Sequence, residues 1–319
     1  MTNSEKRKNR IGFYLPLFVI VTPIAVILRT LAYLNDMNLQ GHFESNSMVF
    51  ASNIIVGIFA FIFLLHSLSQ SRNDSVPIES FSNYPSFLPS GILAVATLFS
   101  VYELFSSITP VFKTMVENEE EFTLSPQTII AIAGIIFGLG ATASFVVNIL
   151  IETKHSQLRA LFGIFTVLFL CFYSISIYFG GSGAANVQQR ALTVISMIFS
   201  ASFFLFEIRM SLGRSKWHSY VGFGLSSSTI LFYSSVPAII YYFAKQIVPT
   251  GSTVIQLVLM LSLAIYTTAR TILIACAPED EICEIVDEIL DMDYERTNKS
   301  TSHARNNILK EENDGKNNA

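Results

Sequence analysis

Charged residues are scarce in this chain, and their scarcity excludes a water-soluble protein of ordinary composition. Only 14% of the 319 residues are charged, whereas 51% are hydrophobic. A typical soluble domain has about 25% charged residues. We therefore expect most of the chain to lie in lipid.

Cysteine and histidine are also rare, and neither is placed where it could perform familiar chemistry. Cys171 lies inside an apolar stretch, and Cys276 and Cys283 lie near the predicted cytosolic face, where structural disulfides do not form. The five histidines are not spaced as metal ligands, and no glycine-rich loop carries the lysine of a nucleotide site. We expect no metal, no cofactor, no nucleic-acid partner and no enzymatic activity.

Long apolar stretches are what the chain has in abundance. About 20 helical residues cross a bilayer core of about 30 Å. Because these stretches are unbroken rather than alternating, they predict helices and not barrel strands. The predicted fold class is all-α, a polytopic transmembrane bundle spanning residues 11–276. Its expected helices cover residues 11–34, 48–68, 86–112, 125–151, 158–180, 191–212, 218–244 and 253–276.

The loops between these stretches predict how the bundle is oriented. One side carries Lys6, Arg7, Lys8, Arg10, Arg72, Lys154, Arg159, Arg214 and Lys216, and the other carries Lys113, Arg190 and Lys245. Basic residues accumulate in cytoplasmic loops. We therefore predict an N-in/C-in multi-pass protein of the cytoplasmic membrane, with residues 1–10 as a basic cytosolic segment. A reporter fused after Ala319 is expected inside the cell.

Four ionisable residues inside the apolar stretches are the strongest functional leads. A charge at the centre of a bilayer costs at least about 2.5 kcal/mol, so such residues turn inward or find partners. Counted along their helices at about 1.5 Å per residue, Arg29 and Glu103 both lie about 25–27 Å from the cytosolic face. Glu207 and Arg270 share a level near that face. Two charge pairs are therefore predicted, and each is either a structural ion pair or the lining of a polar cavity.

Small residues in the fourth stretch predict a close helix contact. Gly134, Gly138 and Thr142 recur at four-residue spacing, which lets helix backbones approach one another in lipid. Close packing inside the bundle is the favoured interpretation. The alternative is the seam of a homo-oligomer.

The segment after the last stretch predicts an acidic amphipathic helix over residues 277–296. Acidic residues occupy the faces left free by an apolar stripe. This helix could dock against the basic inner loops of the same chain or bind a cytosolic protein, and residues 297–319 are expected to be disordered. The apolar stripe consists of Ile282, Ile285, Val286, Ile289 and Leu290.

The region from Glu207 to Leu273 carries a resemblance to a known family. It begins EIRMSLGR, passes through LFYSSVPAIIYYF and ends in YTTARTIL. In these motifs it resembles an uncharacterised family of multi-span membrane proteins of Clostridia-type bacteria. The resemblance implies a bacterial cytoplasmic membrane and the same eight-helix layout, and it implies no activity.

Two functions remain open at this level. The first is a non-enzymatic membrane component that senses, scaffolds or regulates, as the acidic tail and the lack of catalytic groups indicate. The second is a permease for an ion or small charged solute that uses Arg29 and Glu103. Prolines inside the first and seventh stretches, at Pro16, Pro23 and Pro237, favour the second because kinked helices often border a cavity.

Overall fold

The structure is a computed structural model that describes most of the membrane region. The described residues are 3–38, 43, 47–70, 87–117, 125–150, 156–179, 188–212, 217–249 and 251–275. The chain divides into two units, Met1–Cys276 and Ala277–Ala319. The predicted acidic helix over 277–296, its apolar stripe and the tail at 297–319 lie outside the described residues.

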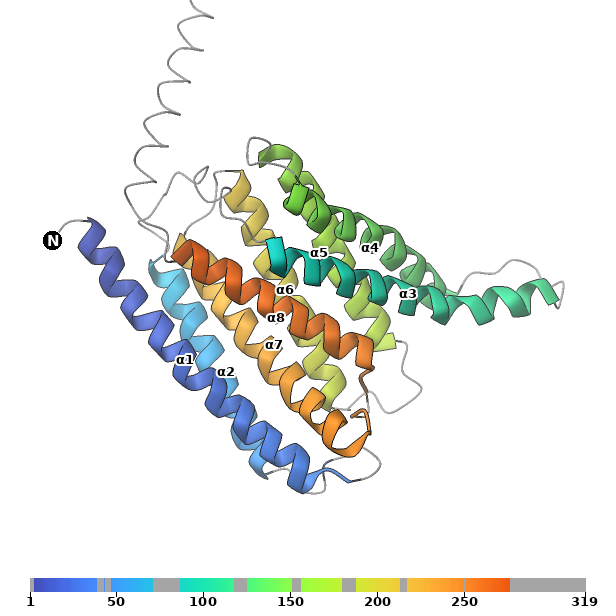
Figure 1. The fold of residues 1–319 in the computed structure, drawn as a ribbon, viewed down its shortest axis with the longest axis horizontal. Helices are drawn as coiled ribbons and strands as arrows, with labels where there is room; N and C mark the ends of the chain where they lie inside the picture. Colours follow the sequence, from blue (N-terminus) through green and yellow to red (C-terminus); the bar gives the residue numbers. More distant parts are fainter. Residues whose placement is uncertain are drawn as a thin grey trace, which may run out of the picture. The chain divides into compact units, whose positions relative to one another are not determined.

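The described residues form eight helices, all long and apolar enough to cross a membrane (Figure 1). The predicted all-α transmembrane bundle is confirmed, and each predicted stretch corresponds to one helix. The chain is thus a multi-pass membrane protein. Its helices are α1 (Asn3–Asp36), α2 (Ser47–Gln70), α3 (Phe87–Glu117), α4 (Pro126–Leu150), α5 (Ser156–Phe179), α6 (Gln188–Ser211), α7 (Trp217–Lys245) and α8 (Val254–Ala275).

The boundaries differ most from prediction at the start of α1. The helix begins at Asn3, eight residues before the predicted position 11. Residues 3–10 are polar and basic, so hydropathy does not mark them, but Glu, Lys and Arg are good helix formers and nothing in this segment breaks a helix. The segment predicted as a separate basic terminus therefore continues the first transmembrane helix.

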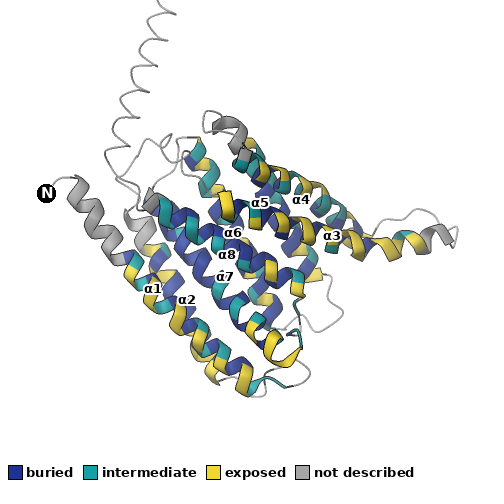
Figure 2. Ribbon diagram, in the orientation of Figure 1, coloured by how far each residue is buried: buried dark blue, intermediate teal, exposed yellow. Residues whose placement is uncertain are grey.

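Helix α7 lies at the centre of the bundle (Figures 1 and 2). It packs against α1, α2, α6 and α8, while α8 also reaches α3. Within their membrane spans, 72% of α7 and 61% of α8 are buried, against 33–44% of the other helices. Helices α3, α4 and α5 pack in sequence order, and α6 closes this group against α7 and α8.

The bundle places apolar side chains outside and hydroxyl groups inside, as a lipid solvent requires. Large apolar residues such as Ile20, Phe61 and Phe243 are exposed, whereas four consecutive hydroxyl residues of α7, Ser226–Thr229, are fully buried (Figure 2). Two of these four hydroxyls are satisfied because they donate to backbone carbonyls one turn earlier. Ser228 and Thr229 donate to the carbonyls of Gly224 and Leu225.

The predicted packing face of α4 contacts helices of the same chain. A methyl group added at Gly138 would overlap the side chain of Val101 in α3 and come within 3.0 Å of the Phe169 ring in α5. A methyl group at Gly134 would lie 2.8 Å from Leu104. Thr142 donates to the carbonyl of Gly138 at 3.0 Å. This face therefore packs inside the bundle, and a homo-oligomer stays a prediction.

Candidate functional site

Glu207 and Arg270 form the ion pair that their shared depth predicts. Nε of Arg270 donates to Oε1 of Glu207 at 2.8 Å. The hydroxyl of Tyr266 donates to the same carboxylate, 3.1 Å from Oε1 and 3.2 Å from Oε2. The pair joins α6 to α8, and the cavity beside Glu207 measures only about 20 Å³. Its geometry is that of a structural pair.

The predicted pairing of Arg29 with Glu103 is wrong. Arg29 donates to residues of α2, α6 and α7, whereas Glu103 accepts from α5, from α8 and from the loop that precedes α8. The two residues are separated because their helices are not neighbours in the plane of the membrane. Equal depth places two residues at one height in the bilayer, but α1 packs against α2 and α7 while α3 packs against α4 and α8.

Arg29 is fully buried among neutral acceptors. Its Nη1 donates to Asn53 Oδ1 at 3.1 Å and to the hydroxyl of Tyr233 at 3.0 Å, and its Nη2 donates to Gln189 Oε1 at 3.2 Å. The guanidinium carbon also lies 4.6 Å from the ring centre of Tyr233 and 5.3 Å from that of Tyr33. Cation–π contacts and charge-assisted hydrogen bonds thus replace a carboxylate.

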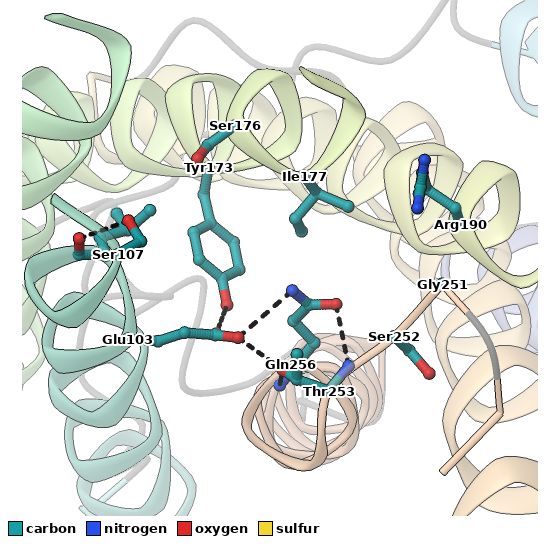
Figure 3. Close-up of a pocket in the computed structure, with 11 residues that line it drawn as sticks. Glu103, Ser107, Tyr173, Ser176, Ile177, Arg190, Gly251, Ser252, Thr253 and Gln256 are labelled. Atoms are coloured by element: carbon teal, nitrogen blue, oxygen red, sulfur yellow. Dashed lines mark hydrogen bonds between the residues drawn. The ribbon is translucent and has the colours of Figure 1, made fainter. Parts of the chain in front are cut away.

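Glu103 is held by three neutral donors from three parts of the bundle (Figure 3). The hydroxyl of Tyr173 donates to Oε2 at 2.5 Å, and that of Thr253 donates to Oε1 at 2.6 Å. Nε2 of Gln256 lies 3.5 Å from the same Oε1. No cation pairs with Glu103 within the part of the chain that the structure describes. The carboxylate therefore has oriented donors and no countercharge.

A polar cavity of about 300 Å³ adjoins this carboxylate. It lies at the end of the bundle where α5 ends and where α6 and α8 begin. Arg190, a buried residue of α6, lines it, and Figure 3 shows its guanidinium apart from the group around Glu103. Arg29 does not line it. The remaining lining residues are Leu104, Ser107, Tyr173, Ser176, Ile177, Gly251, Ser252, Thr253 and Gln256.

The cavity can bind a polar group, and its residues favour one that carries a positive charge. Carboxylate oxygens accept hydrogen bonds from ammonium groups, and hydroxyl and amide groups orient such a ligand. Clusters of three metal-ligating side chains are not found among the described residues.

Sequence reasoning found Glu103 but missed the residues that complete its site. Tyr173, Thr253 and Gln256 are neutral and lie near the ends of apolar stretches, where polar residues attract little attention. Arg190 was counted only as a loop charge. The available signal was three polar residues at the start of the last helix, Ser252, Thr253 and Gln256.

No model of a known protein family, no curated protein and no solved structure matches this chain. The resemblance to a family of Clostridia-type bacteria therefore stays a prediction.

Proposed function

We propose that this protein is a non-enzymatic membrane component that senses a small positively charged or zwitterionic group bound in the cavity beside Glu103. One observation carries the proposal. The carboxylate of Glu103 faces a polar cavity, is held by Tyr173, Thr253 and Gln256, and lacks a cationic partner among the described residues.

The energetics of a partly buried carboxylate support a cationic ligand. Removing a carboxylate from water costs several kcal/mol, and neutral donors recover only part of that cost. A bound ammonium group would supply the missing opposite charge through a short, charge-assisted hydrogen bond. The cavity of about 300 Å³ limits the part of the ligand inside it to a small group.

The predicted orientation gives the site its side of the membrane. With the N-terminus inside, α5 ends and α8 begins at the outer face, so the cavity opens outward. The proposed ligand group is then presented from outside or from the outer leaflet of the cytoplasmic membrane. A regulatory output on the inner side would fit the acidic segment at 277–296 as a docking helix for a cytosolic protein.

Ligand-observed NMR on the purified protein in nanodiscs tests the binding proposal. Saturation transfer to ethanolamine and phosphoethanolamine is expected for the unaltered protein and absent for Glu103→Gln. Glycerol 3-phosphate, which lacks the ammonium group, is expected to give no transfer. The matched control is Asp36→Asn, which makes the same change of charge outside the cavity. Binding that survives Glu103→Gln contradicts the proposal.

Transport is a second candidate, and one feature of α6 favours it. Buried polar residues follow one face of this helix from Arg190 at the cavity through Thr193, Ser196 and Ser200, and the partly buried Glu207 of the ion pair lies on the same face. Their spacing of three to seven residues keeps them on one side of a helix. Two buried aromatic rings, Phe203 and Phe204, interrupt this polar face before Glu207. We propose that this polar face would line the solute path if the protein transports.

Uptake of radiolabelled ethanolamine into proteoliposomes separates the two candidates. Uptake that depends on Glu103 and survives Asp36→Asn would establish transport. Binding by NMR without uptake would leave recognition as the function. Comparing both readouts on the same preparations removes differences in folding between the variants.

A further inference from the structure

We infer that the ligand is an amino-headgroup phospholipid, whose ammonium group binds at Glu103 and one of whose acyl chains lies in an apolar groove along α3. This inference rests on the proposed function, because it identifies the ligand class of the same site. It depends on a second cavity, whose lining residues on α3 and α8 are sequence neighbours of those that line the first.

The groove is a large apolar cavity of about 990 Å³ on the lipid-facing side of α3. Three helices line it. Helix α3 supplies most of the residues, α4 supplies Ile135 and Leu139, and α8 supplies Ile255. Its α3 residues are mostly exposed, including Phe99 at 55% and Phe105 at 56%. The remaining lining residues are Val95, Leu98, Val101 and Tyr102.

The groove and the polar cavity are lined by neighbouring residues of two short segments, so they lie on neighbouring faces of α3 and α8. On α3, Val101, Tyr102 and Phe105 line the groove, while Glu103 and Leu104 between them line the polar cavity. On α8, Ile255 lines the groove and its neighbour Gln256 lines the polar cavity. A single molecule placed at this junction would therefore have a polar end and an apolar end.

The direction of the groove fits a lipid in a bilayer. From the junction it follows α3 back to Val95, ten residues or about 15 Å toward the middle of the membrane. The polar cavity lies at the end of the bundle where α5 ends and α8 begins, which the predicted orientation places toward the outer lipid headgroups. A phospholipid has the same order along the membrane normal, with its headgroup at the interface and its acyl chains pointing inward.

The charges of the polar cavity select the headgroup. Glu103 offers an acceptor for an ammonium group, and Arg190, which also lines the cavity, is a residue type that binds phosphate. Phosphatidylethanolamine carries both groups. Phosphatidylglycerol carries only the phosphate, so it would leave Glu103 without an opposite charge.

Headgroup contacts should decide selectivity, since the acyl chain gains little from entering the groove. A chain that leaves the bilayer exchanges one apolar surrounding for another, so no hydrophobic driving force favours the move. The groove instead positions a chain whose headgroup is bound. Blocking the groove should therefore weaken binding of the lipid but not of the free headgroup.

Native mass spectrometry of the full chain released from nanodiscs tests this inference. The nanodiscs hold equal amounts of phosphatidylethanolamine and phosphatidylglycerol. Phosphoethanolamine binding is followed by NMR in nanodiscs of phosphatidylglycerol alone, where no phosphatidylethanolamine competes for the site. We expect retained phosphatidylethanolamine to exceed phosphatidylglycerol at least tenfold. Glu103→Gln should abolish this preference and also remove phosphoethanolamine binding.

Two tryptophan substitutions on α4 test the groove itself. Leu139→Trp fills the groove and should lower retained phosphatidylethanolamine at least fivefold while phosphoethanolamine binding persists. The control is Ile136→Trp. Ile136 and Leu139 are similarly exposed, at 59% and 52%, but only Leu139 lines the groove. Both substitutions point into lipid, so neither should prevent folding.

Three outcomes would overturn the inference, and they differ in what they leave standing. Equal retention of both lipids with Glu103-dependent phosphoethanolamine binding would reject the lipid but keep the proposed function. If the unaltered protein neither retains phosphatidylethanolamine nor binds phosphoethanolamine, both the inference and the proposed function are rejected. A dimer that Leu139→Trp converts to a monomer, with no lipid retained, would assign the groove to a second copy of the chain.

Discussion

Nε of Arg270 in α8 lies 2.8 Å from Oε1 of Glu207 in α6, and only 6% and 13% of these two side chains are exposed. The pair therefore joins two helices within the bundle. Because water has little access to either side chain, each charge is compensated by the other. Arg29, also a buried arginine, has neutral partners instead, so the two sites should respond differently to substitution.

Breaking the ion pair should destabilise the protein more when one partner is removed than when both are. Glu207→Gln leaves the Arg270 guanidinium buried without its opposite charge, which should lower the free energy of unfolding by about 3 kcal/mol. Adding Arg270→Gln should cost less than the sum of the single changes. Thermal unfolding in nanodiscs measures this.

The control for the ion pair is Arg209→Gln. Arg209 is exposed and lies two residues from Glu207, so the change should stay within about 0.5 kcal/mol. Additive losses in the Glu207 and Arg270 cycle would contradict the pairing.

Substitutions of Arg29 and Glu103 should be additive because the two residues share no partner. Arg29→Gln removes hydrogen bonds to Asn53, Tyr233 and Gln189, and Glu103→Gln weakens those from Tyr173 and Thr253. We expect the double variant to equal the sum of the singles within about 0.5 kcal/mol. A coupling free energy well above that, from unfolding in nanodiscs, would show that the residues interact.

Gly224→Ala should destabilise the contact between α7 and α8. A methyl group there would overlap the hydroxyl of Thr271 and come within 3.0 Å of its methyl carbon. Threonine has a stiff side chain, so it cannot easily move aside. We expect a loss of about 1–3 kcal/mol from overpacking, measured by thermal unfolding.

Gly57 is the matched control for Gly224, because no atom lies within 4 Å of the position that its added methyl group would occupy. Gly57→Ala should leave the unfolding temperature unchanged or raise it, since alanine is the better helix former. Equal losses at the two positions would mean that contact with α8 does not limit Gly224.

Tyr173→Phe should weaken the support of Glu103. The buried hydroxyl of Tyr173 donates to the carboxylate at 2.5 Å, and a hydrogen bond to a charged group contributes about 1.5–3 kcal/mol. The expected loss is about 2 kcal/mol in unfolding free energy. Tyr178→Phe removes the same hydroxyl group from a residue that is 54% exposed, so it should have little effect. Equal stability of the two variants would contradict this role for Tyr173.

Deleting residues 279–295 tests the acidic segment. If the predicted helix folds back on the basic inner loops, the deletion should lower the unfolding temperature of the membrane region. An unchanged temperature would favour a cytosolic partner, which a pulldown with and without these residues would then identify.

Agreement between sequence and structure was best where one physical rule acts alone. Each helix was predicted from hydropathy, because a segment that crosses a bilayer must be apolar and must satisfy its own backbone. The start of α1 was missed because residues 3–10 lie outside the apolar span and only their helix propensity marks them. The pairing of Glu207 with Arg270 followed from depth, which in this case coincided with neighbouring helices.

The sequence by itself determined the class of this protein, the eight membrane-spanning helices of the described region and the predicted heights of Arg29, Glu103, Glu207 and Arg270. These depend on distance along the chain and on transfer into lipid. Only the tertiary structure decided which charges meet. It separated Arg29 from Glu103, surrounded Glu103 with Tyr173, Thr253 and Gln256, and placed a polar cavity beside an apolar groove. The physical reason is that lateral order in a bundle depends on side-chain packing between helices, which hydropathy along one helix does not encode.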